Sequence, residues 1–387
     1  MTLGQESLKG APRLDPMPRI ESLAGVFHPH AIEVQDFSHY ALVIDVRTQE
    51  AYADDHIPGA VRLSPAAAFA APPGTGEAID SSGLLMARES TPQSTTQSAP
   101  EGLLPPALAA QVASLQPEQA ILVYCGRGGL DSLPVARALR WRGWAVDVLP
   151  GGWINYRRWV QAGLEVLPRM VSFRVIACSL GTEAGRVLQA LRDVGQQVLD
   201  VEALAICWRA SLGPAARAQP AQAWFESQLL QAMRTFDPRL PVWISDVGSR
   251  LGALCLPGAL THALAIAPVA KLQVDLAERV RGWQEDEPML SAGAPEVLRA
   301  VEPWLSNSSK VLRAELKRLA ANGDKEALLS RLLVDVADLA YLEEAEHRGV
   351  RRHVLLPLSA ESLAPGPLAD AVHTWLHAVQ APHPEVD

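Results

Sequence analysis

Short apolar runs alternate with amphipathic stretches along most of this chain, and this alternation is the feature that most restricts how it folds. Each apolar run has the length of one strand, and each amphipathic stretch has the length of a helix. Strands that alternate with helices form a parallel sheet with helices on both faces, so we expect an α/β fold. In the first part of the chain the expected strands are 41–44, 61–63, 121–124 and 145–149, and the expected helices are 50–54, 108–115, 132–142 and 153–160.

The pattern starts again near Leu167, which predicts a second parallel-sheet domain. Its expected strands are 173–178, 197–200, 241–244 and 272–274, and its expected helices are 185–193 and 223–236. After residue 296 the chain is mostly helical, with amphipathic stretches at 310–321 and 325–348. Residues 66–102 lack periodicity and are rich in Ser, Thr, Gln and Pro, which predicts a flexible insertion. The expected organisation is a leader (1–35), a first domain (36–165), a P-loop-like α/β domain (168–290) and a helical C-terminal region (291–387).

Cys125 ends the apolar run 121–124 and opens a glycine-rich turn that leads into the helix expected at 132–142. Glycines let backbone N–H groups turn toward the thiol, and a helix N-terminus adds positive potential. Both effects favour the thiolate, which is the nucleophilic form. We interpret Cys125 as catalytic rather than as a small buried core thiol. Its active-site loop consists of Gly126, Arg127, Gly128, Gly129, Leu130, Asp131 and Ser132.

A cysteine phosphatase is the rival interpretation of this loop. That chemistry needs an Arg at the sixth position after the Cys, where its guanidinium holds phosphate oxygens in a bidentate manner. Asp131 occupies this position, and its carboxylate would repel a phosphate dianion, so the sequence disfavours a phosphatase. Asp131 suits the start of the following helix, and its charge opposes a thiolate at Cys125. Arg127 either steadies a bound oxyanion or pairs with Asp131.

Composition narrows the partners and the compartment. The net charge of −9 excludes a general attraction for nucleic acid, so RNA contact requires a local basic patch. Four Cys without paired spacing argue against a disulfide framework and a structural zinc site, and we expect no metal. The first ten residues have no apolar signal core, and no apolar run of 18 residues occurs. We therefore expect a cytoplasmic protein without membrane contact, and the sequence does not indicate its oligomeric state.

Arginines and tryptophans interleave on the two helices expected after the Cys125 loop. Guanidinium and indole groups together suit phosphate contact and base stacking on single-stranded RNA. The alternative is that the tryptophans pack a domain interface while the arginines are solvated. The candidate RNA contacts are Arg137, Arg140, Arg142, Arg157 and Arg158. A second basic stripe, either a solvated helix face or a contact for the body of an RNA, consists of Lys310, Arg313, Lys317 and Arg318.

Three short motifs combine in the first domain. They are Asp45-Val46-Arg47, His56-Ile57-Pro58-Gly59-Ala60 and Tyr124-Cys125-Gly126-Arg127-Gly128-Gly129, followed by the turn Gly151-Gly152-Trp153. In this combination, residues 36–165 resemble the rhodanese domain. The resemblance implies that Cys125 carries sulfur as a persulfide and that the loop amides hold the anionic sulfur. Asp45 and Arg47 either orient this loop from the neighbouring strand end or form a surface ion pair.

Further phrases extend the resemblance over residues 36–350. They include Val198-Leu199-Asp200-Val201-Glu202, Gln219-Pro220, Pro241-Val242-Trp243-Ile244 and Ala267-Pro268-Val269. Together with the Cys125 loop they resemble the family of bacterial tRNA 2-selenouridine synthases. The resemblance implies that wobble 2-thiouridine of tRNA receives a geranyl group from geranyl diphosphate, and that selenium from selenophosphate then displaces the sulfur. It also implies Cys125 as the chalcogen carrier, a P-loop for a phosphate-bearing ligand and no tightly bound cofactor.

The sequence departs from that family at the P-loop. A P-loop needs a Lys to meet phosphate charge and a Ser or Thr hydroxyl to meet Mg²⁺. Ala184 and Gly185 stand at these positions, and together with Gly181 and Thr182 they form a vestigial phosphate loop. The apolar frame is kept, so we expect the fold to survive better than the phosphate chemistry. The first-choice function is a selenium or sulfur transferase acting on tRNA. The alternatives are a rhodanese-type sulfurtransferase whose second domain is a scaffold, and a non-catalytic tRNA-binding relative.

Overall fold

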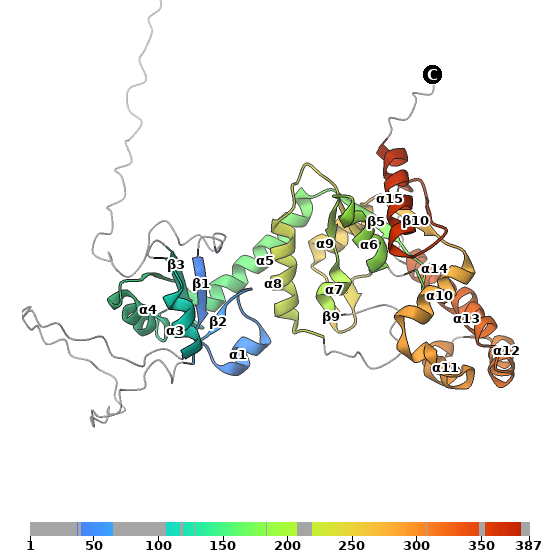
Figure 1. Ribbon diagram of the computed structural model, residues 1–387, viewed down its shortest axis with the longest axis horizontal. Coiled ribbons are helices and arrows are strands. Elements are labelled where there is room, and N and C mark those ends of the chain that lie inside the picture. The colour runs from blue at the N-terminus through green and yellow to red at the C-terminus, as the bar shows by residue number, and fades with distance from the viewer. Residues whose placement is uncertain are drawn as a thin grey trace, which may run out of the picture. The chain divides into compact units, whose positions relative to one another are not determined.

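Two parallel β-sheets, each covered by helices, organise the computed structural model (Figure 1). The residues that it describes are 37, 40–64, 106–116, 119–127, 129–182, 184–206, 219–306, 308–347 and 353–380. The expected leader, the expected insertion, Gly128 and Glu183 lie outside the described residues. The expectation of an α/β fold with two parallel sheets and a helical C-terminal region is confirmed.

The described chain forms two compact units. The first comprises the described residues of 1–47 and 61–154, and the second comprises those of 48–60 and 155–387. Segment 48–60 thus packs with the second unit, although it lies inside the first domain expected from the sequence. Two contacts account for this: the Ser227 hydroxyl donates to Oδ2 of Asp55 at 3.3 Å, and the rings of His56 and Trp224 lie 4.3 Å apart.

The first unit is built on a four-stranded parallel sheet with the order β2-β1-β3-β4. Its strands are β1 (Tyr40–Asp45), β2 (Val61–Arg62), β3 (Ala120–Tyr124) and β4 (Ala145–Val148). The helices are α3 (Pro106–Ala113) and α4 (Ser132–Trp141). Ile44, Val123 and Leu139 are fully buried in the core between sheet and helices. The strands are nearly continuous apolar runs because both faces of a parallel sheet are covered.

The second unit is built on a five-stranded parallel sheet with the order β11-β10-β5-β7-β6. The strands are β5 (Phe173–Ala177), β6 (Gln197–Leu199), β7 (Val242–Ser245), β10 (Val269–Gln273) and β11 (Leu358–Ser359). Helices α6 (Ala184–Asp193) and α15 (Pro365–Gln380) lie side by side, and Leu188, Trp243 and Val372 are fully buried beneath them (Figure 1). Strand β11 was not predicted, because two residues carry too little pattern.

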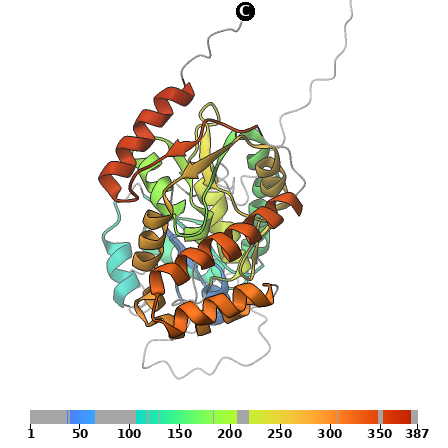
Figure 2. The same ribbon diagram turned by 90° about the vertical axis from the view of Figure 1, so that its right-hand side faces the viewer.

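The remaining elements are α1 (Gln49–Asp54), α5 (Gly152–Met170), α7 (Val201–Ala205), α8 (Gln222–Arg234), β8 (Arg250–Leu251), β9 (Leu254–Cys255), α9 (Gly258–Ile266), α10 (Leu276–Asp286), η3 (Pro288–Ser291), α11 (Ala294–Val301), η4 (Glu302–Leu305), α12 (Lys310–Ala321), α13 (Lys325–Leu332), the π-helical η5 (Leu333–Asp338) and α14 (Leu339–His347). The bounds predicted for α12 are confirmed. Helix α5 is longer than predicted: it continues beyond residue 160, the expected end, to Met170 and contains Pro168. Helices α11, α12 and α13 pack around buried Val297, Leu316 and Leu328 (Figure 2).

Candidate active site and phosphate loop

Cys125 directly follows β3, and its sulfur faces the start of α4. The N–H of Gly129 donates to Sγ at 3.3 Å, and the hydroxyl of Ser132 donates to it at 3.5 Å. Gly129 has a φ of 127°, a conformation that glycine adopts without steric cost. Ser132 is the first residue of α4. The sulfur therefore lies among hydrogen-bond donors at a helix start, where a negative charge is stabilised.

Opposing effects act on the Cys125 thiol. Burial raises its pKa, since a charged sulfur is disfavoured away from water. The Ser132 hydroxyl and the backbone N–H groups of Gly129, Asp131 and Arg127 lower the pKa, and the net direction is downward. Cys125 is only 2% exposed, so a reactant must reach the sulfur through the surrounding loop. The arrangement favours a shielded thiolate.

A buried ion pair lies beside the strand end that carries Cys125. Arg47 donates to Oδ2 of Asp45 at 2.7 Å, and the Arg47 N–H donates to Oδ1 at 2.9 Å. The Tyr124 hydroxyl donates to the same Oδ2 at 2.6 Å. Asp45 is fully buried and the Arg47 side chain is 8% exposed. The pair is therefore not a surface ion pair, which was one of the two alternatives open from the sequence.

The turn after β4 closes the other side of the Cys125 loop. The N–H of Trp153 donates to the Cys125 carbonyl at 2.9 Å, and the N–H of Ile154 donates to the Gly126 carbonyl at 3.3 Å. The Arg47 guanidinium lies over the Trp153 ring, 3.9 Å from its centroid, which suits a cation–π contact. One arginine thus links the Asp45 carboxylate to the turn that holds the backbone of the loop.

The outer part of the loop faces solvent. Arg127 and Asp131 are both exposed, and no hydrogen bond or ion pair joins them in the described chain. Asp131 occupies the N-cap position of α4, as expected, but its side chain makes no capping hydrogen bond. Leu130 is 85% exposed, which is unusual for a large apolar side chain in a loop around a reactive group. A side chain added at Gly126 would meet open space.

The vestigial phosphate loop runs from the end of β5 to the start of α6. Thr182 is 1% exposed and its hydroxyl donates to the Ser179 carbonyl, so it is turned away from a ligand. Ala184 opens α6, and Gly185 carries no side chain into the open space beside it. The loop therefore lacks the Lys and the Ser or Thr that a phosphate-binding turn uses at positions 184 and 185.

Helix α10 occupies the inner side of this loop. The Arg279 guanidinium donates to the Leu180 carbonyl at 3.0 and 3.1 Å and to the Asp338 carboxylate at 2.7 and 2.9 Å. A Cβ added at Gly181 would lie 2.5 Å from the Arg279 carbonyl oxygen, so α10 approaches the loop backbone closely. After β7, on the neighbouring strand, the Asp246 carboxylate accepts from the Tyr341 hydroxyl at 2.6 Å. These polar groups serve internal contacts.

Comparison with known proteins agrees with this two-part arrangement. Residues 31–158 match the family model described as a rhodanese-like domain, and residues 171–321 match the tRNA 2-selenouridine synthase AAA domain. The chain is similar to the tRNA 2-selenouridine synthases. The resemblance expected from the sequence is thereby confirmed.

Individual relatives bear the name tRNA 2-selenouridine synthase. The protein from Cronobacter sakazakii is 31% identical over 42% of this chain and 43% of its own length. The protein from Marinobacter nauticus is 29% identical over 41% of this chain and 42% of its own length. The protein from Psychromonas ingrahamii is 26% identical over 59% of this chain and 69% of its own length. The chain thus spans less than half the length of the first two synthases.

The five candidate tRNA contacts differ in their availability. Arg157 donates to Asp55 and Ser227 at 3.3 and 3.1 Å and also pairs with Glu226, so its guanidinium is committed to the protein. Arg140 folds back onto the Val146 carbonyl at 2.8 Å. Arg137 and Arg158 are exposed, and Arg142 is half-buried. Trp141 is 65% exposed and lies one helical turn after Arg137 on α4, where guanidinium and indole share a face.

Neither a metal-binding cluster nor a membrane-spanning helix occurs among the described residues. The described ranges contain no group of three or more His, Cys, Asp or Glu side chains that could hold a metal ion. Within those same ranges, each helix is too short or too polar to cross a bilayer.

Several residues around the candidate site have roles that the sequence did not predict. Tyr124 and Trp153 are two of them, because their roles depend on contacts with Asp45 and Arg47 from a different strand. Arg279 and Tyr341 are two more, since each reaches the phosphate-loop region from a distant part of the chain. The only sequence clue was that Tyr124 and Trp153 flank the two glycine turns.

Proposed function

We propose that this chain is a tRNA-modifying transferase of selenium or sulfur, with Cys125 as the chalcogen carrier. The observation that carries the proposal is the donor set around Sγ, which comprises the Gly129 N–H at 3.3 Å and the Ser132 hydroxyl at 3.5 Å. A terminal sulfur or selenium on Cys125 is an anion, and donors that hold a thiolate suit that anion as well. The rhodanese-like match of residues 31–158 supports the same role.

The loading step needs no external oxidant. The Cys125 thiolate attacks the outer sulfur of a sulfane donor such as thiosulfate. An S–S bond forms on Cys125, the S–S bond of the donor breaks, and sulfite leaves with the bonding electron pair. The new terminal sulfur carries the negative charge, next to the Gly129 N–H and the Ser132 hydroxyl.

The reaction that we propose for the whole protein is the one implied by its relatives. Wobble 2-thiouridine of tRNA is converted through its S-geranyl form to 2-selenouridine, with geranyl diphosphate and selenophosphate as substrates. In the exchange step the C2–Se bond forms and the C2–S bond breaks, and the sulfur leaves with its geranyl group and the electron pair. The P–Se bond of selenophosphate breaks as water adds to phosphorus, and inorganic phosphate leaves. The match of residues 171–321 and the names of the relatives support tRNA as the substrate.

A specific observation favours a second candidate, a rhodanese-type sulfurtransferase whose second unit is a scaffold or a tRNA-binding module. The loop at 181–185 has Ala184 and Gly185 where a working P-loop has a Lys and a Ser or Thr. The Arg279 guanidinium donates to the carbonyl of the adjacent Leu180. A phosphate-bearing substrate gains little from such a loop. This candidate keeps Cys125 and gives up the geranylation step.

Nucleoside analysis of tRNA separates the two candidates. Deletion of the gene should abolish 2-selenouridine in digested bulk tRNA, as measured by mass spectrometry, and leave its precursor 2-thiouridine behind. Complementation with the wild-type gene should restore 2-selenouridine, and complementation with Cys125→Ser should not. No change in either nucleoside after deletion would contradict the first candidate and favour the second.

The purified protein separates an enzyme from a scaffold. Wild type should transfer sulfur from thiosulfate to cyanide, which takes the terminal sulfur of the persulfide and leaves as thiocyanate. Cys125→Ser should be inactive. Absence of transfer by wild type, in a protein that still binds tRNA, would indicate a non-catalytic tRNA-binding relative.

A further inference from the structure

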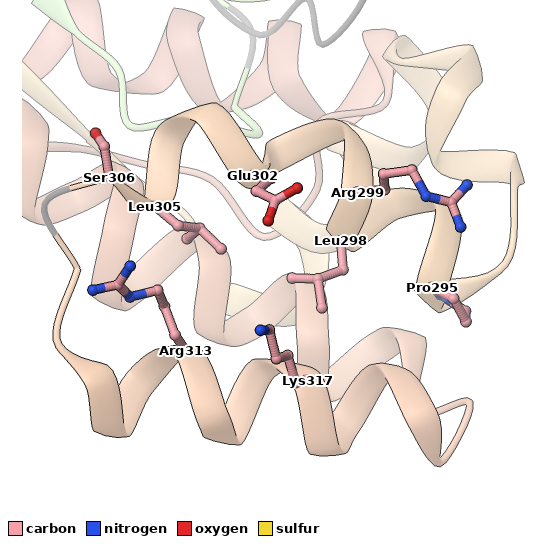
Figure 3. Close-up of a pocket in the computed structure, with 8 residues that line it drawn as sticks. All are labelled: Pro295, Leu298, Arg299, Glu302, Leu305, Ser306, Arg313 and Lys317. Atoms are coloured by element: carbon pink, nitrogen blue, oxygen red, sulfur yellow. The ribbon is translucent and has the colours of Figure 1, made fainter.

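A groove of about 330 Å³ lies between α11 with η4 on one side and α12 on the other (Figure 3). Its apolar floor includes Leu298 and Leu305, and its charged rim includes Arg299, Glu302, Arg313 and Lys317. Arg313 and Lys317 rise from α12 into the space beneath η4, as Figure 3 shows. Three cations and one carboxylate line the groove, in a chain whose net charge is −9.

The cations of this groove lack the ion pairs that three other arginines of the second unit make. Arg279 pairs with Asp338, Arg281 with Glu278, and Arg331 with both Glu315 and Asp335. Arg299, Arg313 and Lys317 make no ion pair or hydrogen bond within the described part of the chain. All three are exposed. No ion pair among the described residues holds these three side chains, so they are available to an anion.

The spacing of Arg313 and Lys317 on α12 makes their positive charges repel each other. Arg313 and Lys317 are four residues apart, so their side chains are neighbours on the helix surface. Like charges in this arrangement destabilise a helix. Glu315, which lies between them in the sequence, pairs with Arg331 instead. A bound anion between Arg313 and Lys317 removes the repulsion.

We propose that this groove binds the phosphodiester backbone of the tRNA substrate, away from the base that is modified. The inference rests on the proposed function in so far as tRNA is the substrate. Cationic side chains around a backbone-binding groove neutralise phosphates and position the RNA without reading its sequence.

The extent of the charge favours a chain of phosphates over a small diphosphate. Lys310 and Arg318 continue the positive charge along α12 on both sides of Arg313 and Lys317, and both are exposed. The eight helical steps from Lys310 to Arg318 span about 12 Å. This line is longer than a single diphosphate and open along its length, whereas a site for a small anion encloses it with converging donors.

Salt-dependent binding of labelled tRNA to the full chain tests the proposal. Arg313→Glu combined with Lys317→Glu should weaken binding at about 100 mM salt by at least about tenfold. The plot of log affinity against log salt concentration should become shallower by about 2, for two lost phosphate contacts. Arg313→Lys with Lys317→Arg keeps the charges and should bind within about threefold of wild type.

The matched control is Arg192→Glu with Arg239→Glu, which changes net charge by the same amount at exposed sites elsewhere in the second unit. It should bind tRNA like wild type. Equal weakening by the control, or unchanged affinity and slope in Arg313→Glu with Lys317→Glu, would overturn the proposal. Titration with inorganic diphosphate distinguishes a site for a small diphosphate from a site for the tRNA backbone. The proposal would also be overturned if wild type bound diphosphate saturably, Arg313→Glu with Lys317→Glu lost that binding, and the salt slope for tRNA stayed unchanged. Wild type that fails to bind tRNA would instead refute the proposed function, and the groove's assignment with it.

Discussion

The hydroxyl of Tyr124 donates a hydrogen bond of 2.6 Å to Oδ2 of Asp45, and both residues are fully buried. The same oxygen accepts from Arg47 at 2.7 Å. Because Tyr124 immediately precedes Cys125, this contact ties the ion pair at the end of β1 to the strand end that presents the sulfur. The rigidity of the Cys125 loop thus depends on residues of two strands and on Trp153 in the following turn.

Removal of the Asp45 charge should destabilise the protein strongly. Asp45→Asn keeps the shape of the side chain but leaves the Arg47 guanidinium buried without its anion. We expect the free energy of unfolding to fall by about 3–5 kcal/mol, as for other broken buried pairs. Urea unfolding followed by tryptophan fluorescence measures it. Tyr124→Phe, which removes one hydrogen bond to the carboxylate, should cost about 1.5–3 kcal/mol. A loss below about 1 kcal/mol in Asp45→Asn would contradict the structural role of the pair.

The Ser132 hydroxyl should contribute to the reactivity of Cys125. It stabilises the thiolate, so Ser132→Ala should raise the pKa of Cys125 and shift iodoacetamide labelling toward higher pH. At neutral pH the rate should fall by up to about tenfold, since fewer molecules hold a thiolate. Rates in wild type and Ser132→Ala should converge above the pKa of both proteins. An unchanged pH profile would show that the hydroxyl does not act on the sulfur.

The carboxylate of Asp131 should oppose the same thiolate. Asp131→Arg exchanges a repulsive charge for an attractive one near the sulfur, so labelling at neutral pH should become faster. Asp131→Asn should give an intermediate rate. Because Asp131 is exposed, the differences should shrink as salt is added. Equal rates in all three proteins at every pH would refute this effect of Asp131.

The vestigial phosphate loop should not bind nucleotide. Isothermal titration of wild type with magnesium-bound nucleoside triphosphate at millimolar concentration should show no saturable binding. Ala184→Lys with Gly185→Ser restores the cation and the hydroxyl, and the open space at Gly185 accepts the new side chain. This variant should bind at least about tenfold more tightly than wild type. Saturable binding by wild type would contradict the interpretation of the loop.

Sequence reasoning predicted the strands well where they are buried on both faces. The runs that became β1, β3, β5 and β7 are almost purely apolar, so their pattern is independent of distant residues. The same reasoning missed β11, whose two residues are defined only by pairing with β10. The contacts of segment 48–60 with α8 were not predicted either, because hydrogen bonds such as Ser227 to Asp55 span more than a hundred residues.

The part of the candidate site that lies in one short segment was predictable, and the part that depends on distant residues was not. The Cys125 loop is local, and its glycines and helix start indicate its geometry from the sequence alone. The burial of Asp45 with Arg47 was not predictable, because it depends on Tyr124 and Trp153 from other elements. Among the candidate tRNA contacts, Arg140 and Arg157 turn inward to the Val146 carbonyl and to Asp55. Nothing in their local sequence distinguishes them from exposed Arg137.

Peptide mass spectrometry after treatment with thiosulfate tests the role of Cys125 as carrier most directly. The account predicts that the peptide containing Cys125 gains the mass of one sulfur atom in wild type. Cyanide should remove that sulfur, and Ser132→Ala should accumulate it more slowly at neutral pH. A protein that remains folded and transfers sulfur to cyanide while Cys125 stays unmodified would contradict the account.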